Sequence, residues 1–196
     1  MRPRVAADWA VDLAGRHQLE RAVAAAIAAS DTLRLVRDAT DSFTELDFTA
    51  IGPGHRPVII ELKAKHQPYR GWERYAPNVD PDNLFILDEL AFRNLLDAGR
   101  YAFLLVYDTP IDRWCVWSTI DLALTAKTRV ARPLAGSGAV KAKLLLDLDD
   151  AAHTCTDLTA VIDAITEDVE TCDLWWTSIA PWPYGPAVAT PTRRTS

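Results

Sequence analysis

The sequence predicts a mixed α/β domain in which helices flank a central sheet of mixed strand direction. Two observations carry this prediction. Apolar residues recur at helical spacing near the start, the middle and the end of the chain. Between those stretches lie shorter runs that are continuously apolar or alternate with polar residues, which is typical of strands. The expected order is one helix, three strands, a helix, two strands and a last helix.

Residues 8–29 predict the first helix, because this stretch is rich in alanine and places Val23, Ala24 and Ile27 on one apolar stripe. Three strands are expected after it, over residues 33–39, 42–51 and 58–64. The second strand alternates polar and apolar side chains, and the third begins with the apolar run "VII". "GPGHRP" between them has the composition of a tight turn, so the two strands are expected to form a hairpin.

The second half of the chain continues with an amphipathic helix over residues 83–99, which Gly99 is expected to end. "YAFLLVYD" and "RWCVWSTI" predict two strands joined by "TPID", and "KLLLDL" predicts a further edge strand. A last helix is expected over residues 156–170, with Thr156 or Asp157 as its N-cap.

Length and composition limit the class of protein. The 196 residues are enough for one domain, which we expect over residues 1–178, followed by a Pro-rich, extended or disordered tail over residues 179–196. A net charge of −6 argues against a protein that coats nucleic acid non-specifically, although a local basic path stays open. No apolar run approaches the roughly 18 residues of a membrane span. Three scattered cysteines and the lack of a secretory signal pattern favour a reducing, cytoplasmic setting.

The hairpin places acidic side chains opposite one another. If its turn is centred on Gly54, residues whose numbers sum to 108 are paired, so Asp47 lies opposite Glu61 and Glu45 lies opposite Lys63. Opposed residues are about 4.5–5.5 Å apart at Cβ, a distance at which two carboxylates repel. A divalent cation between them, or a proton on one of them, would relieve the repulsion. A bulge in the turn would shift this register by one residue.

The first helix supplies a further acid. Glu20 precedes Val23, Ala24 and Ile27 by three, four and seven residues, which puts it on the apolar stripe. A buried acid needs a partner. The alternative is that Glu20 lies at the margin of the stripe and forms a surface pair with Arg16. Likewise, the Glu-x-Lys pattern at the end of the third strand is by itself common, and could be a solvated pair on an edge strand.

Together these stretches resemble a known family. "TELDF" followed by "VIIELKAK" is similar to the motif of the PD-(D/E)xK nuclease superfamily, and "GRHQLERAV" resembles the first helix of its Holliday-junction-resolvase-like branch. The resemblance covers about residues 15–120 and implies a restriction-endonuclease-like core. One departure is Leu46, which stands where the motif has proline.

The resemblance implies a role for each polar residue. Asp47 and Glu61 correspond to the metal-binding acids, Lys63 to the catalytic lysine and Glu20 to an accessory acid, with the Leu62 carbonyl as a further ligand. The cofactor implied is Mg²⁺, for which Mn²⁺ would substitute. A metal held there could activate water and polarise a phosphoryl oxygen, and the lysine would place positive charge beside the scissile phosphate.

The loop that follows the third strand is a candidate contact for nucleic acid, because cations can bind phosphates and aromatic rings can stack on bases. The residues concerned are Lys65, Tyr69, Arg70, Trp72 and Arg74. The alternative for each aromatic residue is that it packs on its own domain.

Three functions therefore stay open at this point. The first is a Mg²⁺-dependent DNA endonuclease of restriction, resolution or repair type, with DNA as its partner and a homodimer as one route to two-strand cutting. The second is an inactive nuclease-like fold that binds nucleic acid or protein. The third is an unrelated α/β domain in which Glu61 and Lys63 form a simple ion pair.

Overall fold

The computed structural model describes residues 6–42, 45–133 and 140–179. The helices are α1 (Ala6–Ala29), α2 (Glu89–Ala98), α3 (Thr119–Leu124) and α4 (Leu158–Ile179). The strands are β1 (Arg34–Asp38), β2 (Phe48–Ile51), β3 (Pro57–Lys65), β4 (Leu84–Asp88), β5 (Ala102–Asp108), β6 (Arg113–Ser118), β7 (Thr128–Pro133), β8 (Val140–Asp147) and β9 (His153–Cys155). Nearly all of the expected tail lies outside the described residues.

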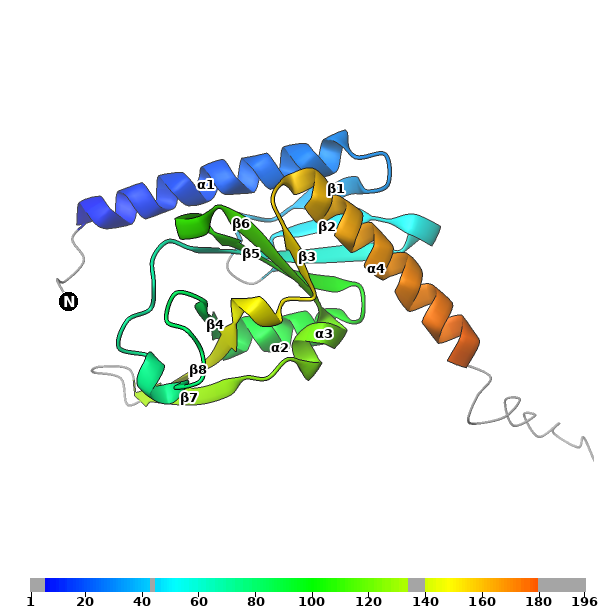
Figure 1. The fold of residues 1–196 in the computed structure, drawn as a ribbon. Coiled ribbons are helices and arrows are strands. Elements are labelled where there is room, and N and C mark those ends of the chain that lie inside the picture. The colour runs from blue at the N-terminus through cyan, green and yellow to red at the C-terminus, as the bar shows by residue number, and fades with distance from the viewer. Residues whose placement is uncertain (1–5, 43–44, 134–139, 180–196) are drawn as a thin grey trace, which may run out of the picture.

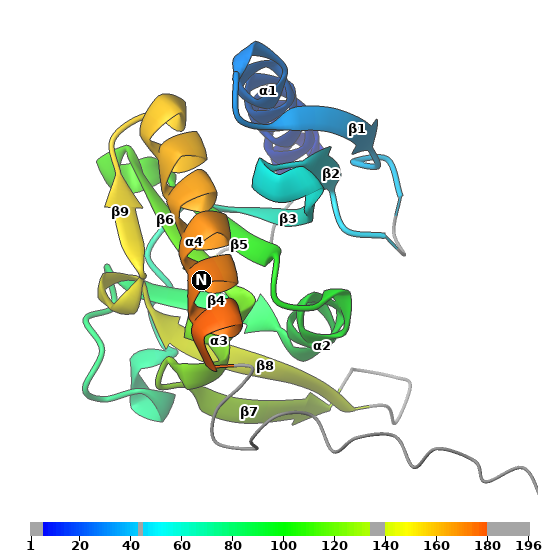
Figure 2. The ribbon, with the colours of Figure 1, turned by 90° about the vertical axis from the view of Figure 1, so that its right-hand side faces the viewer.

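A six-stranded mixed sheet forms the centre, in the order β1-β2-β3-β5-β6-β9. The β3–β5 pair is parallel and the other neighbours are antiparallel. Helices α1 and α4 cover one face, where their apolar side chains pack with those of β2, β3, β5 and β6. Helices α2 and α3 and a second sheet cover the other face (Figures 1 and 2). The predicted mixed α/β class, with helices flanking a mixed sheet, is confirmed.

The second sheet is the main departure from the expected fold. It has three antiparallel strands in the order β4-β8-β7. Its strand β4 occupies the first part of the segment expected to be one helix over residues 83–99, and the helix begins only at Glu89. The reason is pairing: Leu84 lies opposite Asp147 and Asp88 opposite Lys143, so β8 satisfies the backbone of β4. The expected edge strand "KLLLDL" is therefore the middle strand of this sheet.

Other element ends follow local chemistry. Gly99 ends α2 with φ 92°, as expected of a C-cap glycine. The Asp157 side chain accepts a hydrogen bond from the Ala160 N–H, which identifies it as the residue that caps α4. The expected strand "RWCVWSTI" stops at Ser118, because Ser118 and Asp121 form a capping box that starts α3. Strands β7 and β9 were not expected from the sequence.

Within the described ranges, none of the helices combines the length and the apolar character that a membrane crossing requires.

Candidate active site

The hairpin of β2 and β3 has the register that counting from the turn predicts. Phe48 lies opposite Ile60 and Ile51 opposite Pro57, so paired residue numbers sum to 108. Gly54 adopts the left-handed conformation, with φ 62°, that glycine allows at low cost in such a turn. The ladder ends at Phe48, and the next position toward the carboxyl end of β3 brings Asp47 to the level of Glu61.

Asp47 ends the ladder with its own side chain. Its Oδ2 accepts a hydrogen bond from the Leu62 backbone N–H at 2.7 Å, in place of a backbone carbonyl from β2. Beyond this point β3 continues alone on its β2 side, while its other edge stays paired with β5 as far as Lys65 opposite Asp108. We call the point where β2 and β3 separate the fork. Beyond it, a short edge of β3 has no partner strand on the β2 side among the described residues, so side chains can approach it.

Glu61 and Lys63 project from this unpaired stretch. The Glu61 carboxyl is buried, and the Lys63 ammonium donates a hydrogen bond to its Oε1. Burial raises the pKa of Glu61 above its ordinary value, the Lys63 charge opposes that shift, and the Asp47 charge adds to it. The charge of Asp47 thus acts on Glu61 in the direction that the opposed placement of the two acids predicts.

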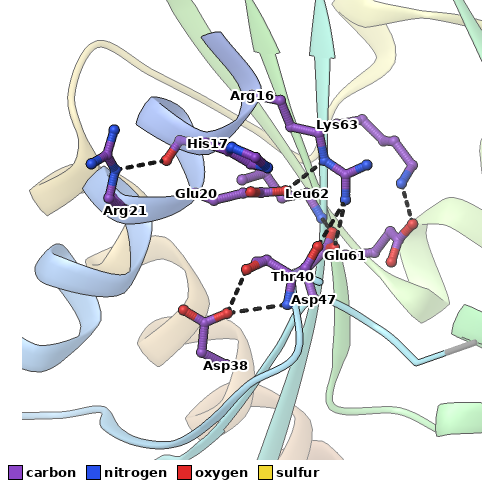
Figure 3. A network of polar contacts seen from close by, with 10 residues as sticks. All are labelled: Arg16, His17, Glu20, Arg21, Asp38, Thr40, Asp47, Glu61, Leu62 and Lys63. Carbon is purple, nitrogen blue, oxygen red and sulfur yellow. Dashed lines mark hydrogen bonds and ion pairs between the residues drawn. The ribbon is translucent and has the colours of Figure 1, made fainter. Parts of the chain in front are cut away.

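Helix α1 brings a third acid and a second cation (Figure 3). Glu20 is only 4% exposed, so its place on the apolar stripe is confirmed. It also forms the pair with Arg16 that was the alternative, with 2.5 Å between Arg16 Nε and Glu20 Oε1. Arg16 Nη2 lies 3.6 Å from Asp47 Oδ1 and donates to the Thr40 carbonyl at 3.4 Å. One guanidinium therefore bridges α1 to the fork.

Arg16 is the site residue that the sequence reasoning did not assign. The sequence predicts it only as a surface partner of Glu20. Its spacing of four residues before Glu20 was the available signal, because such residues are neighbours on a helix. Its link to Asp47 joins segments 31 positions apart, which no local pattern predicts.

Glu45 does not take the place expected opposite Lys63. The β2–β3 ladder stops before reaching it, and its carboxylate pairs with Arg37 of β1 at 2.5 Å. The residue therefore belongs to the β1 side of the sheet and not to the acid cluster.

The donor atoms suit a hard divalent cation by their chemistry, because the buried acids Asp47 and Glu61 present carboxylate oxygens. Their present spacing does not yet form a cage. Among residues 6–42, 45–133 and 140–179, no three histidine, cysteine or acidic side chains are grouped so that they could hold a metal ion. Arg16 and Lys63 instead supply the positive charge.

Lys65 corrects an expectation. It was expected to contact nucleic acid, but its side chain is fully buried. Its ammonium donates to the Asp82 carbonyl and lies 3.3 Å from Asp108, which also has Arg113 Nε at 3.4 Å. The Lys65 side chain is therefore part of the protein interior, where its charge pairs with Asp108. Lys65 is withdrawn from the candidate DNA contacts.

The rest of the loop divides into packed rings and exposed cations. Tyr69 and Trp72 are partly buried against Ala76, Leu84, Val130 and Leu145, as the packing alternative had it. Arg70 and Arg74 are exposed. Arg74 lies over the Tyr75 ring and donates to its hydroxyl at 2.9 Å. Arg70 and Arg74 are therefore more accessible than the Tyr69 and Trp72 rings, and the Tyr75 ring is exposed beside Arg74.

Comparisons with known proteins add little to this geometry. No family model matches the chain, and no curated protein matches it. Among solved structures, a nuclease from a fusselovirus aligns with 88% of this chain and 98% of its own, at 13% sequence identity and a TM-score of 0.44. A likeness of that size carries no argument about function, so the assignment below rests on the side chains of the site.

Proposed function

We propose that the protein is a metal-dependent nuclease that hydrolyses phosphodiester bonds in DNA, with Mg²⁺ or Mn²⁺ as its cofactor. The observation that supports this most is the pairing of two buried acids, Asp47 and Glu61, with Lys63 beside them at the fork of β2 and β3. Each buried charge costs desolvation free energy, so a cluster with only a structural role would be expected to contain fewer buried charges.

The residues divide the work as follows. Asp47 and Glu61 would hold the cation, and Glu20 is placed to support it through the same cluster. The Leu62 carbonyl is a further candidate ligand: the N–H and C=O of one strand residue point to the same side, and this N–H already points at Asp47. The cation, when bound, would activate water and polarise a phosphoryl oxygen.

Lys63 would stabilise the transition state. Its side chain is 34% exposed and ends beside Glu61, so its ammonium can face both the acid cluster and an approaching phosphate. Negative charge builds on the phosphoryl oxygens as the water attacks, and a fixed cation is worth most at that moment. Arg70 and Arg74 would bind phosphates of the DNA backbone that lie away from the bond being cut.

A cation titration of the melting temperature tests the proposal. Mg²⁺ or Mn²⁺ should raise the melting temperature of the wild type by mass action, and Asp47→Asn should abolish that rise. The amide keeps an oxygen that can accept the Leu62 N–H, so the variant should still fold. Glu45→Gln is the matched control, because it removes a nearby acid that lies outside the cluster. An equal response of Asp47→Asn and wild type would reject the site.

A second candidate is a nuclease-like fold that only binds DNA or a protein. The observation in its favour is that Arg16 and Lys63 already contact the acids, which could then be a purely structural network. A panel of plasmid, linear, single-stranded and branched DNAs separates the two. Cutting of any member in Mg²⁺ or Mn²⁺ supports the nuclease, and retention of DNA without cutting supports the binding module.

A further inference from the structure

The Arg16 guanidinium lies at the carboxylate oxygens of two acids in the proposed cation site, Glu20 and Asp47. It contacts Glu20 Oε1 through Nε at 2.5 Å and Asp47 Oδ1 through Nη2 at 3.6 Å (Figure 3). The other oxygen of Asp47 is committed to the Leu62 N–H. The Arg16 charge also lowers the pKa of Glu61, after the larger effects of burial, Lys63 and Asp47. All three acids of the cluster therefore feel this one side chain.

Charge balance makes the guanidinium and a metal ion competitors. Glu20, Asp47 and Glu61 carry three negative charges when ionised, and Arg16 and Lys63 carry two positive ones. A divalent cation added to the present arrangement would give four positive charges against three, with a guanidinium and a metal ion at the same oxygens. Like charges at such short range repel strongly in a partly buried site.

We propose that Arg16 is the protein's own counter-cation for this cluster, and that a divalent cation binds by displacing it. The inference rests on the proposed function, since it concerns the same metal site. In the metal-free protein Arg16 neutralises the acids and lets them be buried. When the cation enters, Arg16 leaves Asp47 and its charge becomes available to the approaching phosphate.

The geometry allows this exchange. The Arg16 side chain is 46% exposed, whereas the side chains of Glu20 and Asp47 are 5% exposed. Its contact with the Thr40 carbonyl, at 3.4 Å, is long for a hydrogen bond. The acids are thus held by the core, while the guanidinium enters from the solvent side and has water into which it can withdraw.

The test compares Arg16→Gln with Arg21→Gln. Arg21 lies on the same helix, is exposed and donates to the His17 carbonyl at 3.2 Å, on the far side of the helix from Asp47 in Figure 3. Both variants remove one positive charge, so a general electrostatic effect would appear in both. Mg²⁺ and Mn²⁺ affinities are measured by calorimetry on the whole chain, together with melting temperatures without metal.

Displacement predicts that Arg16→Gln binds the cation about tenfold more tightly than wild type, which corresponds to about 1.4 kcal/mol. It also predicts a lower melting temperature without metal and a larger rise on adding it. Arg21→Gln should behave as wild type in both. In the wild type, the Nε–H resonance of Arg16 should shift as Mg²⁺ is added.

An unchanged or weaker cation affinity in Arg16→Gln would overturn the proposal, because it would mean that Arg16 positions the acids for the metal. An equal gain in both variants would overturn it too. Arg16→Gln could bind cations more tightly while neither variant nor the wild type cuts DNA. That result would keep Arg16 as the competitor of the cation and would reject only the proposed nuclease activity.

Discussion

Asp47 illustrates how a single side chain changes what a strand edge can do. By accepting the Leu62 N–H, it takes the place of one ladder hydrogen bond and leaves the rest of β3 open toward α1. Glu61 and Lys63 follow on that open stretch, and Arg16 and Glu20 reach it from the helix. A buried acid cluster with its own cations results from one interrupted pairing.

Arg70 is expected to contact a DNA phosphate, because it is exposed on the loop that follows β3. Arg70→Ala should therefore weaken DNA binding and reduce the slope of log affinity against log salt by about one. Arg74→Ala should lower the slope similarly. Arg93→Ala is the control, since Arg93 is an exposed arginine on α2 that pairs with Glu89. Identical slopes for all four proteins would show that the loop does not touch phosphate.

Lys65 is expected to matter for stability and not for DNA. Lys65→Met leaves the buried Asp108 with only the Arg113 contact, which should cost about 3 kcal/mol of unfolding free energy. Urea denaturation measures this cost. Lys141→Met, which removes a half-exposed lysine from its pair with Asp88, should cost at most about 1 kcal/mol. A cost for Lys65→Met no larger than that of the control would contradict a structural role.

These residues show what the sequence could reveal about the site. Asp47 and Glu61 were predictable as an opposed pair because strand register follows from counting around a short turn. The burial of Glu20 followed from helical periodicity. The burial of Lys65 did not follow from any local pattern, because its partner Asp108 is 43 residues away on β5.

At the level of elements, β4 shows why a short apolar run is ambiguous. "NLFILD" fits the start of an amphipathic helix as well as a strand, and only a partner can decide between them. The partner β8 comes more than fifty residues later, and cross-strand ion pairs join the two: Asp88 contacts Lys143 and lies 3.1 Å from Lys141. The capping box at Ser118 is local, by contrast, and could have been recognised.

The Asp88 pairs predict a specific pH dependence. Burial acts to raise the pKa of Asp88, but hydrogen bonds and charges from Lys143 and Lys141 outweigh it and hold the pKa below the ordinary 3.8. A depressed folded-state pKa stabilises the protein above the unfolded value, and this contribution is lost as the pH falls through the folded value. Asp88→Asn should therefore be less stable than wild type above pH 3.8, with the difference shrinking below it.

Urea denaturation of both proteins on either side of pH 3.8 measures that difference. Asp147→Asn is the matched control, because it removes an acid at the other end of the same strand pair, opposite Leu84. A stability difference between wild type and Asp88→Asn that stays constant through the acid range would mean that the lysine pairs do not stabilise the β4–β8 contact.

At the level of the whole molecule, the succession of α1, β1, β2, β3, α2, β5, β6 and α4 was predictable, but β4, α3, β7, β9 and the second sheet were not. Local periodicity predicts α1, β3, β5 and α4, whereas β7, β8 and β4 form a sheet only through contacts between distant segments. The site combines a local feature, the β2–β3 hairpin, with a contact between distant segments, that of α1 with Asp47. The hairpin fixes two acids, α1 adds a third, and β3 stays paired with the parallel strand β5 beyond the point where β2 ends.

The most direct test of the central claim is single-turnover nicking of DNA by Lys63→Ala in Mg²⁺ or Mn²⁺. If Lys63 stabilises the developing charge, cleavage should fall by about 10²–10³-fold while cation affinity persists, because Asp47 and Glu61 remain. Lys63→Arg should recover only part of the rate, since a guanidinium is a planar fork and not a compact charge. Equal rates for Lys63→Ala and wild type would contradict the account and leave Lys63 as the ion-pair partner of Glu61.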